Sequence, residues 1–148
     1  MIDLFLWLLS SLLGFLLAVA TLLLFVRLRR KKTARVLETW VLSEDGAMRL
    51  GGIEARYCGA DSGCPRGPNN GAVVIGERNL YYQHFLEKRP SLVVPLAGIR
   101  QVTLEPSFRG VARKSEDSDF LVIRTSDDNR LGFLLKDPQA LRDMLQPG

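Results

Sequence analysis

The hydrophobic positions of this chain fall into two regions with different patterns. Residues 4–26 contain no charged side chain, and only two serines, one glycine and one threonine interrupt their Leu, Phe, Val, Ala and Trp. At about 1.5 Å per residue, these 23 residues would form roughly 35 Å of helix. A hydrocarbon core is about 30 Å thick, so the pattern predicts one transmembrane helix near the N-terminus.

A cleaved signal peptide is the alternative interpretation, because Ala18, Val19 and Ala20 have the small-x-small form of a cleavage site. Three observations oppose it. Asp3 stands where a signal peptide would carry positive charge, the apolar run continues to Val26, and the cations follow the run. We therefore favour a retained anchor.

A cluster of six cations follows the apolar run with no acid among them. It consists of Arg27, Arg29, Arg30, Lys31, Lys32 and Arg35, and is called the basic cluster below. Positive charge beside a span marks the cytoplasmic side, so we expect a single-pass plasma (inner) membrane protein with its N-terminus outside and its C-terminal domain in the cytoplasm. The cluster is most simply a stop signal, and attraction to anionic lipid headgroups is its second possible role.

Beyond the span, the pattern predicts a connector and then a β domain. Residues 33–50 are expected to continue the helix, fray and become a connector. Within them, Trp40, Val41 and Leu42 could lie against either the bilayer interface or the domain. The chain thus divides into a transmembrane helix (1–26), a basic juxtamembrane segment with connector (27–50) and a folded domain (51–148).

The folded domain reads as about seven short strands separated by turn residues. Two connections stand out: residues 58–71, a long loop rich in Gly and Pro, and residues 109–119, a charged hairpin connection. The strands are expected at 53–57, 72–75, 80–85, 92–96, 101–105, 120–125 and 131–135.

The chain ends differently, with a helix predicted at residues 138–146. Asp137 is a suitable N-cap, and Pro138 fits the first helical position. The apolar face expected to close the open end of the sheet consists of Ala140, Leu141, Met144 and Leu145.

Residues 53–146 resemble the pleckstrin-homology (PH) superfamily, and are most similar to GRAM-like and bacterial PH-like domains. The resemblance is carried by residues 71–75 leading into 79–82, by residues 93–102, which look like an I-P-L-x-x-I-x-x-V passage, and by residues 133–137. It implies a mainly antiparallel β domain with one C-terminal capping helix, acting as a binding module without catalysis. Such domains bind phosphoinositides with basic residues around the first hairpin. Here Arg56 precedes the loop and Arg66 lies within it as candidate loop contacts, whereas the strand at 72–75 has no cation.

Charge and motif content narrow the function. Residues 37–148 contain 14 basic and 15 acidic residues, so the domain is near neutral and we expect no nucleic-acid partner. No phosphate-binding loop, G-x-S-x-G or HExxH motif occurs, so we expect no enzyme activity, no catalytic residue and no cofactor. Cys58 and Cys64 match neither redox nor zinc spacing; we interpret them as reduced loop cysteines, with a local disulfide as the alternative and no metal site expected.

The transmembrane segment carries one further pattern. Ser10, Gly14 and Ala18 are spaced four apart and form a small-residue stripe on one helix face, the kind of face at which membrane helices approach closely. The sequence thus leaves two hypotheses. The chain is an accessory or scaffold subunit that docks on integral membrane proteins of a larger complex through its helix and domain, or it senses anionic lipid headgroups at the cytoplasmic surface.

Overall fold

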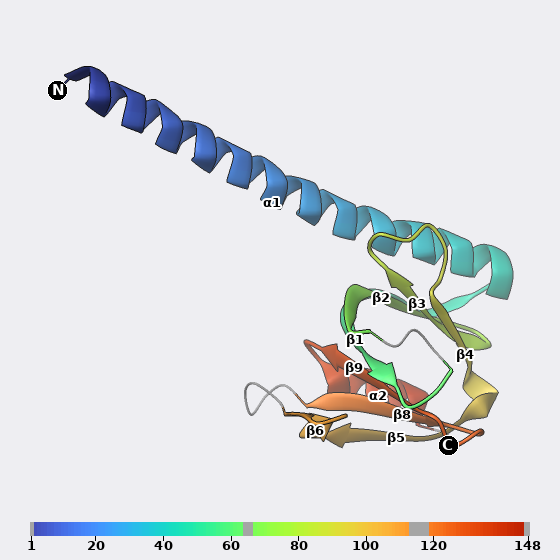
Figure 1. Cartoon of the computed structure of the whole chain (residues 1–148). Helices are drawn as coiled ribbons and strands as arrows, with labels where there is room; N and C mark the ends of the chain where they lie inside the picture. The colour runs from blue at the N-terminus through green and yellow to red at the C-terminus, as the bar shows by residue number, and fades with distance from the viewer. Residues whose placement is uncertain (1, 64–66, 113–118, 147–148) are drawn as a thin grey trace.

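The N-terminal part of the protein is a single long helix. The structure, a computed structural model, describes residues 2–63, 67–112 and 119–146. Helix α1 (Ile2–Asp45) has 44 residues, and its N-terminal half extends away from the rest of the chain (Figure 1). Among the described residues this is one helix long and apolar enough to cross a membrane, and the rest of the chain buries none of its apolar stretch.

The helix does not fray after the basic cluster, which corrects the expected connector. It continues through residues 33–45 and ends at Gly46, whose φ of 79° lies in the left-handed region. The Gly46 N–H donates to the Leu42 carbonyl at 3.1 Å, as in a helix end closed by a glycine. The apolar segment and the segment that approaches the β domain are therefore one uninterrupted helix.

The remainder is a seven-stranded antiparallel sheet with a small two-stranded extension. The sheet order is β4-β3-β2-β1-β9-β8-β5, and β6 pairs with β7. The strands are β1 (Met48–Ala60), β2 (Asn69–Gly76), β3 (Asn79–His84), β4 (Leu92–Pro95), β5 (Ile99–Glu105), β6 (Ser107–Phe108), β7 (Val111–Ala112), β8 (Phe120–Thr125) and β9 (Arg130–Leu135), and a 3-10 turn, η1 (Leu96–Gly98), precedes β5.

The seven predicted strands all occur, and the errors lie at their ends. Strand β1 begins at Met48 and continues to Ala60, so Cys58 lies in a strand and not in a loop. Strand β2 begins at Asn69. Because β1 also extends to Ala60, the predicted loop at 58–71 is shorter at both ends. The predicted connection at 109–119 contains strand β7, the second strand of the small β6–β7 hairpin.

One face of the sheet encloses the main core. Three aromatic rings, of Tyr57, Tyr82 and Phe133, are fully buried with centroids 5.4 to 5.8 Å apart. Such ring contacts stabilise a core beyond the area they bury. They join β1, β3 and β9, so the core links strands distant in sequence.

Helix α2 (Pro138–Leu145) closes one side of this core. The Ala140 N–H donates to Asp137 Oδ1 at 3.2 Å, which confirms the predicted N-cap. Leu141 and Leu145 are buried in the core, whereas Ala140 and Met144 of the predicted apolar face are exposed. The buried face of α2 is thus narrower than the sequence indicated.

The C-terminal half of α1 covers the other face of β2 and β3. Leu37 and Val41 are completely buried against Ala72, Val74 and Tyr81. Because β2 is covered on both faces, all of its residues from 71 to 76 are buried, in line with the continuous apolar run that the sequence shows there. The sheet is therefore packed between the core and helix α1.

Candidate functional site

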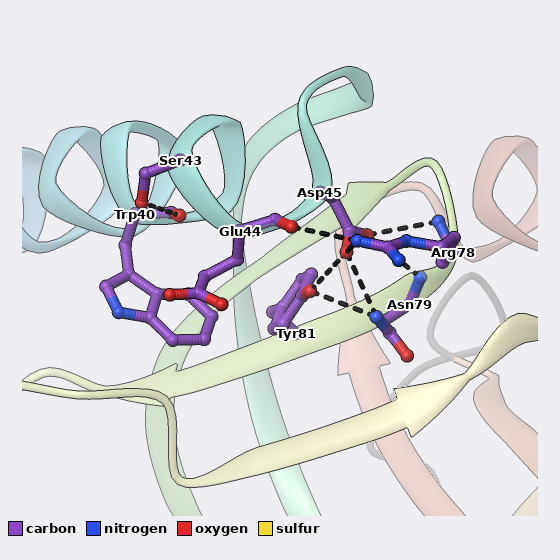
Figure 2. Close-up of polar contacts among 7 residues, drawn as sticks. All are labelled: Trp40, Ser43, Glu44, Asp45, Arg78, Asn79 and Tyr81. Carbon is purple, nitrogen blue, oxygen red and sulfur yellow. Dashed lines mark hydrogen bonds and ion pairs between the residues drawn. The ribbon is translucent and has the colours of Figure 1, made fainter.

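The end of α1 is fastened to the β2–β3 turn by one buried carboxylate. Asp45 Oδ2 accepts hydrogen bonds from the backbone N–H groups of Arg78 and Asn79, at 3.0 and 3.1 Å. Asp45 Oδ1 accepts from the Tyr81 hydroxyl at 2.8 Å and from Asn79 Nδ2 at 3.1 Å. The Arg78 guanidinium lies 3.6 Å from Oδ1 and donates to the Glu44 carbonyl (Figure 2). We call these four residues, Asp45, Arg78, Asn79 and Tyr81, the Asp45 latch.

The latch keeps its carboxylate ionised although it is buried. Burial alone would raise the pKa of Asp45, but the hydrogen bonds from Arg78, Tyr81 and Asn79 outweigh it and leave that pKa below its ordinary value. Burial and the bond to Asp45 raise the pKa of Tyr81. Both oxygens of Asp45 are engaged, so the group is arranged to hold the helix in place.

The middle of the helix–sheet contact is tight because β1 has glycines there. Glu38 Oε1 accepts from the Gly52 backbone N–H at 2.6 Å. A Cβ on Gly52 would lie 2.8 Å from the Ala34 Cβ, so only glycine allows the strand to approach the helix this closely. Trp40 packs edge-to-face on Tyr81 at 5.3 Å, which places it against the domain and answers the question the sequence left open.

A third contact lies nearest the predicted membrane boundary. The Phe85 carbonyl, in the β3–β4 loop, accepts from Arg29 Nε and from Thr33 Oγ1, both at 3.4 Å. The Arg30 guanidinium lies 5.5 Å from the Phe85 ring centroid and 3.7 Å from Glu54. The β3–β4 loop is thus held against α1 about one turn beyond the apolar span.

The structure divides the basic cluster between this contact and the surface. Arg30 is half-buried, and Arg27, Arg29, Lys31, Lys32 and Arg35 are exposed. Two exposed residues of the β3–β4 loop border the same region of the surface, Leu86, which is 67% exposed, and Lys88. Arg89, also exposed, follows Lys88 in the chain.

The other predicted site residues do not gather at one place. Gly14 has open space around its Cα, and Ser10 and Ala18 are exposed like it on the free half of α1. Arg56 is an exposed residue of β1 opposite Asn70 of β2, and Arg66 lies outside the described residues.

The two cysteines cannot be described as a pair, because Cys64 also lies outside the described residues. Cys58 is half-buried, and burial raises the pKa of its thiol. A raised pKa lowers the thiolate fraction at neutral pH, which is typical of an unreactive cysteine.

Sequence reasoning missed the residues that dock the helix. Ala34, Leu37 and Val41 recur at helical spacing and precede Asp45-Gly46, a pattern that predicts an amphipathic segment with a glycine end. The abundance of charge between residues 27 and 45 conceals this stripe. The partners of Asp45 lie 33 to 36 residues later and left no local signal.

Comparison of the chain with protein-family models and with curated proteins finds no match to either.

Proposed function

We propose that this protein is a non-catalytic, membrane-anchored binding module, an accessory or scaffold subunit of a larger membrane protein complex. Its N-terminal helix crosses the membrane with the N-terminus outside, and its PH-like β domain lies in the cytoplasm. The observation that carries this proposal is the uninterrupted α1, which is apolar at one end and fastened to the sheet by the Asp45 latch at the other.

A docked helix supports a scaffold role because it fixes the position of the β domain relative to the membrane segment. With a flexible connector, the domain would sample many heights and rotations above the membrane. Here Leu37, Val41 and the latch fix the domain to the helix, so whatever holds the span also sets where the domain lies.

The small-residue stripe faces away from the domain. At about 100° per residue, Gly14 lies roughly 140° around the helix from Leu37, which faces the sheet. A partner helix on Ser10, Gly14 and Ala18 would therefore meet α1 without clashing with the domain.

The test substitutes Gly14→Ile in the full-length protein, with Leu16→Ile as the matched control on another face. The branched side chain holds the helices apart while the span stays apolar, so we expect loss of co-purifying membrane protein at unchanged membrane abundance. If both variants retain their partners as the wild type does, the stripe is not the docking surface and the scaffold proposal loses its transmembrane contact.

A second function, contact with anionic lipid headgroups, is favoured by one observation. The exposed cations of the basic cluster and of the β3–β4 loop lie close to the apolar span. Each cation at a negatively charged membrane surface contributes about 1 kcal/mol.

A further inference from the structure

A groove runs along α1 from the end of its apolar span to the β3–β4 loop. Its volume is about 520 Å³. One wall is helical, with Phe25, Leu28, Arg29, Lys32 and Val36 among its residues. The opposite wall is formed by the end of β3 and the following loop, including Phe85 and Lys88.

Apolar and charged residues of the groove are placed at different heights along the helix. Phe25 belongs to the apolar run, Arg29 follows about 6 Å farther along the axis and Lys32 about 10 Å farther. A bilayer about 40–45 Å thick with a core of about 30 Å has a headgroup layer of roughly 5–7.5 Å on each side. If the span ends near Val26, the Arg29 level coincides with this layer and Phe25 lies at the edge of the hydrocarbon.

The charge of the groove favours an anion. Three cations line it, Arg29, Lys32 and Lys88, against one acid, Glu87. The Glu87 carboxylate already accepts a hydrogen bond from Ser91 Oγ. Arg29 is fixed at the rim, because its Nε donates to the Phe85 carbonyl and its guanidinium lies 6.0 Å from the Phe25 ring centroid.

We propose that this groove binds one anionic phospholipid of the surrounding bilayer, with its phosphate among Arg29, Lys32 and Lys88 and its acyl chains along Phe25 and Leu28. The lipid would touch α1 and the β3–β4 loop at once, and would so hold the domain against the membrane surface. The site is formed only where helix and domain meet, so neither part has it alone. The inference rests on the proposed membrane anchoring and deepens the second function above.

The experiment uses full-length protein in nanodiscs of phosphatidylcholine and phosphatidylglycerol in equal parts. Native mass spectrometry after release from the nanodisc counts the lipids retained on each protein, and titration with phosphatidylglycerol gives the affinity. Lys32→Gln with Lys88→Gln removes two groove cations, and Lys31→Gln with Arg89→Gln removes two neighbouring cations that do not line the groove. Thermal unfolding confirms that both variants fold.

We expect the wild type to retain one phosphatidylglycerol in preference to phosphatidylcholine. The groove variant should bind it more than about a hundred-fold more weakly, at about 1.5 kcal/mol for each charge-assisted contact with the phosphate that is lost. The neighbouring variant should behave like wild type, because its two cations make no such contact. Equal weakening in both variants would mean diffuse attraction and would overturn the proposal, as would equal retention of the two lipids.

A protein occupant is the other outcome to exclude. A photo-cross-linking residue in place of Val36, which lines the groove, should yield an adduct of lipid mass in native membranes. A polypeptide adduct in its place would contradict the lipid assignment. Failure of the membrane anchoring itself would look different, since even the wild type would then not be recovered in nanodiscs.

Discussion

At the scale of single residues, Asp45 makes the most direct contribution to holding helix α1 on the sheet. Its carboxylate takes hydrogen bonds from two backbone N–H groups, one amide and one hydroxyl, and its neighbourhood leaves it nearly inaccessible to solvent. Removing a buried acceptor leaves its donors unsatisfied, which costs more than the net value of the bonds themselves. The residue is therefore a sensitive test of whether helix and sheet form one unit.

Asp45→Ala should lower the free energy of unfolding by about 3 kcal/mol, because the Tyr81 hydroxyl and the N–H groups of Arg78 and Asn79 lose their acceptor. Glu44→Ala is the control: its side chain is exposed and only its backbone carbonyl accepts from Arg78, so we expect a change within about 0.5 kcal/mol. Chemical unfolding of the full-length protein in detergent measures both.

Repeating these unfolding measurements at several pH values tests whether the Asp45 carboxylate stabilises the fold in its ionised form. Its pKa is lowered in the folded state, so its contribution is fully present above the ordinary value of 3.8 and is lost as pH falls through the lowered pKa. The difference between wild type and Asp45→Ala should accordingly shrink only below pH 3.8. A difference that is constant down to strongly acidic pH would mean that the carboxylate is not held ionised by these bonds.

At the scale of elements, sequence reasoning worked where the signal is local. The seven strands and the capped helix α2 follow from alternation, turn residues and Asp137, all read within a few positions. The predicted ends of β1 were wrong, because Met48 to Gly52 and Cys58 to Ala60 are interrupted by glycines and carry no clear alternation. These residues form strand because they pair with β2 and β9. The docking of α1 was missed for the same reason, since its stability comes from tertiary packing and its partners are distant in the chain.

That packing predicts how the chain can be shortened. A fragment of residues 30–148 keeps Leu37 and Val41 on the sheet, whereas residues 47–148 leave Ala72, Val74 and Tyr81 uncovered. At about 1.5–3 kcal/mol for each large side chain buried, we expect the shorter fragment to be less stable by roughly 3–6 kcal/mol and to self-associate. Thermal melts and light scattering would show this, and equal melting temperatures with two monomeric fragments would count against the docked helix.

At the scale of the whole molecule, orientation is the first consequence to check. Six cations follow the span and a single acid precedes it, so a reporter fused to the C-terminus should be active in the cytoplasm, and one fused to the N-terminus should not. External activity of the C-terminal fusion would overturn the orientation. It would also remove the reason for treating the cysteines as reduced.

The central claim is that one rigid helix carries the β domain at a fixed position above the membrane. The most direct measurement is an accessibility scan of full-length protein in bilayers, with a single spin label placed in turn at each position from 22 to 43. We predict lipid exposure up to about Val26. Beyond it, protection should recur with a period of about 3.6 residues and be strongest at Thr33, Leu37 and Val41, the positions buried against the domain. Uniform solvent accessibility from residue 33 onward would mean a frayed connector and would contradict the account.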